Sequence, residues 1–378
     1  MRDELARLRR WQADGVRFGL ATVVSTSASA PRPPGATLGL HPDGEVVGSV
    51  SGGCVEGAVV EVATQVLEDG QPQRVTYGIS DDEAFAVGLT CGGTIEVFVR
   101  PVAPDTLDLD ELARRIDAEQ PVAVATIVEH PDRPDLVGTP IVVEPTGAAG
   151  GTGNQALDHA IVEAAQGLLA QGATGLRHFG ADGERRKEDV AVLVESFAPR
   201  PRMLVFGAID FAGAVASIGR FLGYHVTVCD ARERFATPAR FPDADEVVVE
   251  WPHRYLADTD VNERTALCVL THDPKFDVPV LKVALATPAG YIGVMGSRRT
   301  HEDRLERLRA EGVDESDLAR LRAPIGLDLG ARTPQETAVS VAAELVLLRY
   351  GGSGNPLKDV DGPIHRDAAD VVAQAAGA

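Results

Sequence analysis

The chain has 378 residues, which is too long for one typical hydrophobic core and makes two domains the expected organisation. Its hydrophobic content of 44% and charged content of 24% are ordinary for a globular protein, and no apolar run is long enough to span a bilayer. The formal net charge of −20, from 36 basic and 56 acidic residues, argues against nucleic acid and anionic membranes as partners.

The first residues and the cysteines indicate the compartment. Residues 1–8 mix charges and contain no apolar signal-peptide core, and the four cysteines include no closely spaced pair. We therefore expect a reducing, cytoplasmic location and no disulfide framework.

Residues 1–198 are predicted to form a mixed α/β domain. Residues 1–14 place Leu5, Leu8 and Trp11 on one helical face. We expect a helix from Cys54 onward and another over 156–169, and strands at residues 18–24, 46–50, 75–77, 94–99, 121–128, 139–144 and 190–194. No internal repeat is found. A proline-interrupted linker at 198–202 places the domain boundary after residue 198.

Residues 199–350 alternate strands and helices, which predicts a Rossmann-like doubly wound parallel sheet. The expected strands are residues 203–206, 226–228, 246–250, 266–270 and 291–295. In the last helix Thr333 is the expected N-cap, Pro334 takes the first helical position and Glu336 completes a capping box. Residues 351–378, rich in Gly, Asp and Ala, are expected to form a flexible tail.

Two cysteines lie in glycine-rich loops. Cys54 belongs to residues 51–56 (Ser-Gly-Gly-Cys-Val-Glu), and Cys91 to residues 88–93 (Gly-Leu-Thr-Cys-Gly-Gly). Glycine pairs allow positive φ and bring backbone N–H groups close to a ligand. The apolar run after Cys54 predicts a helix whose N-terminus would favour a thiolate. For both cysteines, packing as small residues in tight turns is the simpler alternative. Cys229 and Cys268 lie in or at the ends of apolar strands, where we expect core packing.

Two other cysteine chemistries are alternatives. A zinc site usually takes four nitrogen or sulfur ligands, often from Cys-x-x-Cys pairs, and the sequence has no such pair. A redox disulfide between Cys54 and Cys91 stays open, because spacing alone does not show proximity.

A dinucleotide-binding pattern in the second domain is incomplete. Residues 207–212 (Gly-Ala-Ile-Asp-Phe-Ala) follow a strand and open a helix, and Asp230 ends the next strand. Ile209 stands where the pattern has its second glycine, and its branched side chain would obstruct a pyrophosphate. NAD(P) binding therefore stays open beside a Rossmann-like fold that binds no nucleotide. If a nucleotide binds, Asp230 favours a free ribose diol, whereas Arg232 and Arg234 leave room for a 2′-phosphate.

Two further groups follow predicted parallel strands, at the edge where such sheets bind ligands. His272 and Asp273 form either a general acid/base pair or a hydrogen-bonded loop cap. Ser297 and Arg298, after Gly293 and Gly296, form either an anion site or an ordinary helix start.

With these residues assembled, the chain resembles the XdhC/CoxI family over nearly its whole length. The most specific element is Ser-Gly-Gly-Cys-Val-Glu. The supporting segments are residues 30–32 (Ala-Pro-Arg), 34–36, 48–56, 91–93 (Cys-Gly-Gly), 270–273, 290–293, 296–298 (Gly-Ser-Arg), 326–331 and 333–336.

The resemblance implies an accessory protein for molybdenum hydroxylases such as xanthine dehydrogenase and carbon monoxide dehydrogenase. Such a protein would bind molybdenum cofactor (molybdopterin), protect its sulfurated form and pass it to the apo-hydroxylase, with a cysteine desulfurase supplying the sulfur. Cys54 and Cys91 would contact molybdenum or carry a persulfide.

The other site residues follow from the chemistry of this cofactor. Backbone N–H groups of Ser51, Gly52, Gly53, Gly92 and Gly93 would serve its phosphate and polar pterin edge. Arg32 would be a bidentate phosphate donor. Glu56 would accept a hydrogen bond from the pterin or support the helix N-terminus. The candidates from the second domain are Gly207, Asp230, His272, Ser297 and Arg298.

The leading hypothesis is thus a cytoplasmic cofactor carrier and insertion chaperone rather than a turnover enzyme, with a homodimer as one way to enclose a large cofactor. One alternative is an NAD(P)-dependent oxidoreductase that uses Cys54 or Cys91 as its redox group. Another is a docking adaptor whose Rossmann half only holds the hydroxylase.

Overall fold

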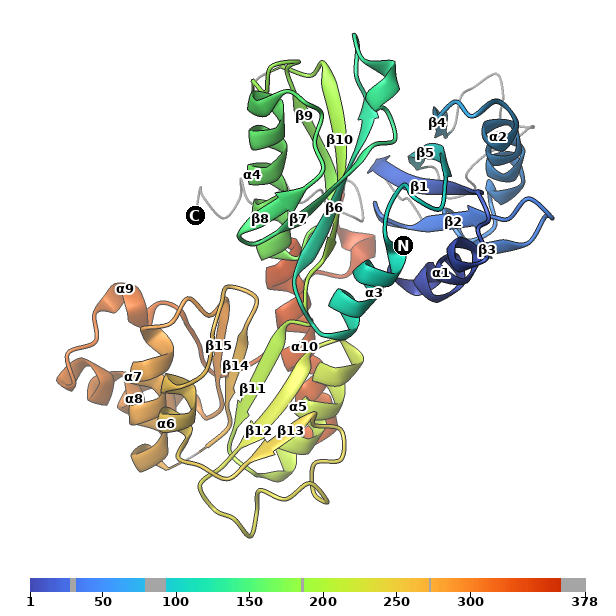
Figure 1. Ribbon diagram of the computed structural model, residues 1–378. Helices are drawn as coiled ribbons and strands as arrows, with labels where there is room; N and C mark the ends of the chain where they lie inside the picture. Colours follow the sequence, from blue (N-terminus) through green and yellow to red (C-terminus); the bar gives the residue numbers. More distant parts are fainter. Residues whose placement is uncertain (28–31, 79–92, 185–186, 272, 362–378) are drawn as a thin grey trace. The chain divides into compact units, whose positions relative to one another are not determined.

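The computed structural model describes residues 1–27, 32–78, 93–184, 187–271 and 273–361 (Figure 1). The chain divides into two compact units between Pro199 and Arg200. Among the described residues, no helix combines the length and the apolar character needed to cross a bilayer.

Unit 1 contains two antiparallel five-stranded sheets. The first half consists of α1 (Leu5–Ala13), β1 (Phe18–Ser27), β2 (Thr37–Leu40), β3 (Val46–Gly48), α2 (Glu56–Asp69), β4 (Gln73–Tyr77) and β5 (Thr94–Val102). The second half consists of α3 (Leu109–Asp117), β6 (Val122–Glu129), β7 (Pro140–Glu144), β8 (Gly147–Ala149), α4 (Gln155–Gln171), β9 (Gly175–Phe179) and β10 (Val190–Phe197).

The two halves of unit 1 share one topology. The strand orders are β3-β2-β1-β5-β4 and β8-β7-β6-β10-β9, and in each half one helix connects the third strand to the fourth. The expectation of no internal repeat is therefore wrong at the level of structure. The repeat is not visible in the sequence because the halves share a pattern of elements rather than a run of identical residues.

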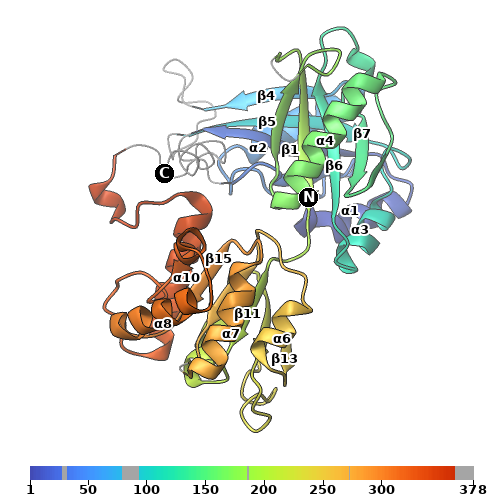
Figure 2. The same cartoon turned by 90° about the vertical axis from the view of Figure 1, so that its left-hand side faces the viewer.

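The two sheets pack face to face, with a helix on each outer face (Figures 1 and 2). Side chains alternate along the strands accordingly. In β1, Ala21 and Val23 face α2, whereas Val24 joins Phe98 and Leu193 in the layer between the sheets. Unit 1 is thus a four-layer sandwich in the order α2, first sheet, second sheet, α4.

Unit 2 is built on a six-stranded parallel sheet, β13-β12-β11-β14-β15-β16. Its strands are β11 (Arg202–Phe206), β12 (His225–Cys229), β13 (Glu246–Val248), β14 (Ala266–Val269), β15 (Tyr291–Val294) and β16 (Leu321–Arg322). Its helices are α5 (Asp210–Phe221), α6 (Pro252–Ala257), α7 (Pro274–Leu285), α8 (Arg298–Ala310), α9 (Glu315–Leu318) and α10 (Pro334–Tyr350).

Helices cover both faces of this sheet, with α5 and α10 on one face and α6, α7 and α8 on the other (Figure 1). The predicted Rossmann-like doubly wound sheet is confirmed, and so is the start of α10, where Thr333 and Glu336 form a capping box. Cys229 and Cys268 are buried in the two apolar layers beside the sheet, as expected. Burial raises the pKa of each thiol to about 12, so both stay protonated at neutral pH.

Candidate functional site

The Cys54 loop connects β3 to α2 in the first sheet of unit 1. The helix begins at Glu56 with Val55 as its N-cap, two residues later than predicted. Cys54 precedes this cap and is exposed, so its thiol lies beside the N-terminus of α2. Gly52 and Gly53 have φ angles of +76° and +116°, with open space where a Cβ would point. Backbone conformation, rather than packing, therefore requires glycine at both positions.

The carboxylate of Glu56 organises the loop. Its Oε1 accepts hydrogen bonds from the Ser49 hydroxyl at 2.6 Å and from the Ser51 N–H at 2.9 Å. Its Oε2 accepts from the Ser51 hydroxyl at 2.6 Å, the Gly53 N–H at 2.8 Å and the Val55 N–H at 3.2 Å. One side chain thereby binds five donors from the seven residues before it.

The two serine hydroxyls complete the arrangement. Ser49 Oγ accepts from the Gly52 N–H at 2.8 Å, and Ser51 Oγ accepts from the N–H groups of Cys54 and Val55 at 3.0 Å each. Every backbone N–H from Ser51 to Val55 thus donates to Glu56 or to a serine that itself donates to Glu56. Such a concave row of N–H groups is a typical anion-binding nest, and here the anion is the protein's own carboxylate.

This geometry sets the charge of Glu56. Burial works to raise its pKa, but hydrogen bonds from Ser49 and Ser51 prevail and lower the pKa to about 2. The side chain is ionised at neutral pH. Of the two roles considered for Glu56, support of the helix N-terminus is the one seen in the structure. The N–H groups of Ser51 and Gly53, predicted to serve a phosphate, already have an acceptor that an incoming anion would have to displace.

Arg32 lies in the connection between β1 and β2, outside the Cys54 loop. Its positive charge acts on the carboxylate of Glu4, whose pKa is raised chiefly by burial, and the Glu4 side chain packs against Gly48 directly before Ser49. The Arg32 Nε is buried and has no hydrogen-bond partner among the residues that the structure describes. Arg32 therefore retains a donor that a ligand could use.

The second predicted cysteine loop is only partly described. Cys91 and Gly92 lie outside the described residues, so the structure does not address their distance from Cys54. Gly93 is described and is buried directly before β5. Within the described ranges, no group of three or more His, Cys, Asp or Glu side chains could hold a metal ion.

The repeat in unit 1 provides an internal comparison for the Cys54 loop. The corresponding connection between β8 and α4 contains Thr152 and Asn154 but no cysteine. Here Asp158 Oδ1 accepts from the Thr152 N–H at 2.7 Å and from its hydroxyl at 2.8 Å, much as Glu56 binds Ser51. In each connection a carboxylate binds residues that precede it in the loop. Of these two connections, the one between β3 and α2 contains a cysteine and the other does not.

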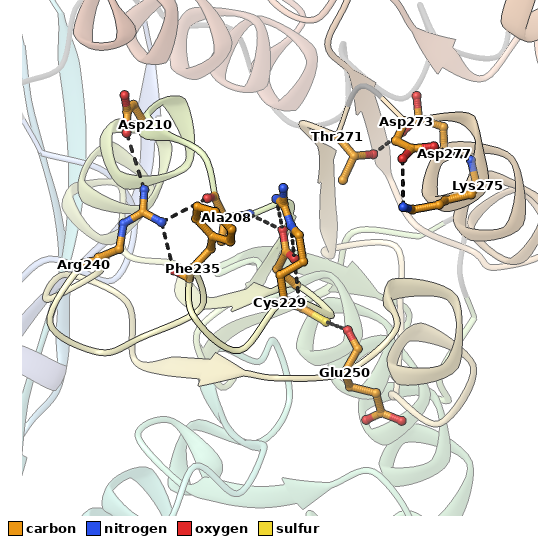
Figure 3. A network of polar contacts seen from close by, with 12 residues as sticks. Ala208, Asp210, Cys229, Phe235, Arg240, Glu250, Thr271, Asp273, Lys275 and Asp277 are labelled. Carbon is orange, nitrogen blue, oxygen red and sulfur yellow. Dashed lines mark hydrogen bonds and ion pairs between the residues drawn. The ribbon is translucent and has the colours of Figure 1, made fainter.

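In unit 2, side chains from later segments bind the backbone of the predicted dinucleotide loop at Ala208 (Figure 3). Asp230 is buried and accepts the Ala208 N–H at 2.7 Å. It also accepts from Arg232 Nε at 2.9 Å and Nη2 at 2.7 Å. Burial tends to raise the pKa of Asp230, but the hydrogen bonds from Arg232 and Ala208 outweigh it and lower the pKa. The oxygens that a ribose diol would need are thus already in use.

Arginine and phenylalanine side chains cover this loop. The guanidinium carbons of Arg232 and Arg240 lie 4.8 Å and 5.5 Å from the ring centre of Phe235. Arg240 also forms an ion pair of 3.5 Å with Asp210, at the start of α5 (Figure 3). Gly207 directly follows β11 and lies close to Thr271, whereas Ile209 packs against the apolar layer beneath α5. NAD(P) binding stays a prediction, and it would require Arg232 to release Asp230.

The remaining candidates lie at helix starts. His272 is outside the described residues. Asp273 caps α7 by accepting the Lys275 N–H at 3.1 Å, which is the loop-cap alternative. Ser297 caps α8 by accepting the Thr300 N–H at 3.1 Å, and Arg298 is the exposed first residue of that helix.

Some residues of these sites were not singled out from the sequence. Ser49 lies within the family motif, and its spacing from Ser51 and Glu56 was the available signal. Asp277 and Arg304 form a buried ion pair of 2.8 Å between α7 and α8. Their separation in the sequence gives no local pattern that would have found them.

Comparison with known proteins identifies the family. The XdhC Rossmann domain matches residues 203–345, and the XdhC and CoxI family model matches residues 11–78 and 115–180. The chain belongs to the XdhC and CoxI family. The resemblance inferred from the cysteine motif is thereby confirmed, and the two segments of the family match fall one in each half of unit 1.

Individual relatives of this family member agree with the assignment. The chain is 26% identical over 332 residues to a probable xanthine dehydrogenase subunit of Bacillus subtilis (strain 168), covering 87% of this chain and 92% of that protein. It is 27% identical over 330 residues to the molybdenum cofactor insertion chaperone PaoD of Escherichia coli (strain K12), covering 87% and 83%. The crystal structure of a xanthine dehydrogenase from Bacillus halodurans shares the fold, with a TM-score of 0.63 at 23% identity, covering 91% of this chain and 95% of that one.

The closure of the Cys54 loop by Glu56 leads to a first prediction. Replacing Glu56 with Gln removes the charge and turns an amide NH₂ group toward backbone donors. The amides of residues 51–55 should then exchange with solvent about tenfold faster or more at neutral pH, measured by hydrogen–deuterium exchange. Glu61→Gln, on the exposed face of the same helix, is the matched control. Unchanged exchange in Glu56→Gln would contradict the proposed closure.

The same variant has a defined pH signature. Because folding lowers the pKa of Glu56 from 4.5 to about 2, its carboxylate stabilises the fold fully above about pH 4.5 and loses this effect as the pH falls toward 2. Glu56→Gln should cost about 1–3 kcal/mol at pH 7 in urea unfolding, and the difference should shrink on acidification.

Removal of the Arg232 side chain should make the carboxylate of Asp230 available to a ligand. In Arg232→Ala the carboxylate loses its guanidinium donors and can accept a ribose diol, so the affinity for NADH should rise roughly tenfold. Fluorescence titration of NADH measures this, with the exposed neighbour Arg234→Ala as control. If the wild type and Arg232→Ala bind NADH with the same micromolar dissociation constant, the hydrogen bonds from Arg232 do not prevent Asp230 from binding the ribose.

Proposed function

We propose that this chain binds molybdenum cofactor and acts as an accessory protein that protects the sulfurated cofactor and inserts it into a molybdenum hydroxylase of the xanthine dehydrogenase or carbon monoxide dehydrogenase type. Membership of the XdhC and CoxI family and the name of the PaoD relative support this role. The proposal makes the chain an accessory factor rather than a turnover enzyme.

The observation that carries the proposal is the exposed Cys54 thiol on a loop locked by Glu56. A thiolate is a soft ligand suited to molybdenum and to sulfur chemistry. Because five N–H groups are already fixed by hydrogen bonds, binding would cost little reordering of the loop.

Two of the described residues suit chemical groups of molybdenum cofactor. Molybdenum cofactor supplies a soft metal with a labile sulfur, an anionic phosphate and a polar pterin. Cys54 suits the metal or its sulfur. The Nε of Arg32, which has no hydrogen-bond partner among the described residues, suits the phosphate. The backbone donors of residues 51–55 do not fit the phosphate while Glu56, Ser49 and Ser51 accept their hydrogen bonds, so the proposed role of this loop is to position the thiol.

Two chemical roles for Cys54 follow. As a ligand, its thiolate would contact the metal directly. As a sulfur carrier, its thiolate would attack the outer sulfur of a desulfurase persulfide, so that the donor's S–S bond breaks, a new S–S bond forms at Cys54 and the desulfurase cysteine leaves as a thiolate. We propose a cysteine desulfurase and the apo-hydroxylase as partners, in the reducing cytoplasm, with a homodimer as one way to enclose the cofactor.

Cofactor retention tests the proposal. The wild type, Cys54→Ala and Cys91→Ala would be purified from cells that make the cofactor, and bound molybdenum and pterin measured. Cys54→Ala should retain about tenfold less cofactor, because the thiol is replaced by a methyl group. Cys229→Ala, which removes a buried thiol in unit 2, is the control and should retain wild-type amounts. Equal retention in Cys54→Ala and the wild type would refute the role assigned to this thiol.

A further inference from the structure

The N-terminus of α8 carries charges of the wrong sign for a helix start. The first turns of α2, α3, α4, α5, α7 and α10 each contain an acidic residue. The first turns of α1, α6 and α8 contain none, and α8 begins with the exposed Arg298 and Arg299. A helix N-terminus is the positive end of the macrodipole, so cations there are unfavourable unless an anion is near.

The hydrogen-bond donors of this helix start are only partly used. Ser297 Oγ accepts the Thr300 N–H at 3.1 Å. The N–H groups of Arg298 and Arg299 have no acceptor within the described part of the chain, as expected at the start of a helix without a ligand.

A buried arginine adds a third positive charge at the same place. Arg304 is only 3% exposed, and its Nη2 donates to Asp277 Oδ2 at 2.8 Å and to the Met295 carbonyl at 3.1 Å. Its Nη1 is buried and has no hydrogen-bond partner among the residues described. This atom lies 3.6 Å from the point where a Cβ on Gly296 would stand, directly before the Ser297 cap.

The ion pair between Arg304 and Asp277 neutralises one of these charges, and the exposed Glu302 and Asp303 lie one turn further along α8 without an ion pair to Arg298 or Arg299 among the described residues. Asp277 also binds the hydroxyl of Thr271. Within the described ranges, Arg298 and Arg299 form no ion pair. A buried guanidinium N–H without an acceptor is costly, and retaining it beside the positive end of a helix is costlier still. An anion bound at Gly296 and Ser297 would accept a hydrogen bond from the Arg304 N–H group and would offset the positive charge of the helix N-terminus.

We propose that the N-terminus of α8 binds a phosphoryl group. The free N–H groups of the first turn and Nη1 of Arg304 hold its oxygens, and Arg298 and Arg299 add positive charge from the rim. The site lies at the carboxyl end of β15, the edge where parallel sheets bind their ligands. Ser297 and Arg298 are also candidates for the molybdenum cofactor, but none of the residues of this site belongs to the Cys54 loop and its test needs no molybdenum cofactor, so it can fail or succeed independently of the proposed function.

Isothermal titration with inorganic pyrophosphate at low ionic strength tests the site. Arg304→Lys keeps a cation next to Asp277 but loses the planar fork, and Arg298→Gln/Arg299→Gln removes only exposed charges. Each should weaken binding about tenfold or more. Arg307→Gln is the matched control, because it removes an exposed charge from the same helix two turns further on, and it should bind as the wild type does.

The surface double variant keeps the test informative if Arg304→Lys unfolds. Glycerol phosphate in place of pyrophosphate distinguishes a monoester ligand from a diphosphate, and the tighter of the two identifies the source. Absence of saturable pyrophosphate and glycerol phosphate binding by the folded wild type would overturn the proposal. So would equal affinities in the wild type and Arg298→Gln/Arg299→Gln.

Discussion

One carboxylate determines the shape of the most distinctive loop in this protein. Glu56 binds the hydroxyls of Ser49 and Ser51 and N–H groups of the turn that follows, so the loop needs no external anion to stay folded. A positive-φ glycine pair usually suggests room for a ligand's phosphate. Here the glycine pair lets the backbone surround the Glu56 carboxylate, and Cys54 in the same loop is exposed.

Comparison of the two halves of unit 1 distinguishes the features of the shared fold from those found only in the Cys54 loop. Both halves close the loop before their long helix with a carboxylate that reaches back, Glu56 in one and Asp158 in the other. Only the first connection carries a cysteine, so the fold alone does not account for the thiol. In unit 2, Asp230 likewise binds the backbone of the loop after β11, whereas α8 begins with two exposed arginines.

Local patterns predicted much of this structure. The capping box of α10, the parallel sheet of unit 2 and the burial of Cys229 and Cys268 follow from short-range spacing and periodicity. Short edge strands such as β8 (Gly147–Ala149) lack an alternating pattern and were missed. The sequence left the role of Glu56 open, because only the turn conformation decides whether its carboxylate faces a ligand or the backbone. The Asp277–Arg304 pair joins two helices and has no local signature.

We propose that Glu56 acts on cofactor binding by positioning Cys54. A double-mutant cycle of molybdenum cofactor dissociation constants, for the wild type, Cys54→Ala, Glu56→Gln and the double variant, tests it most directly. Glu56→Gln should weaken binding in the wild type but have little further effect once Cys54 is absent. Additive effects, or full affinity in Glu56→Gln, would contradict it.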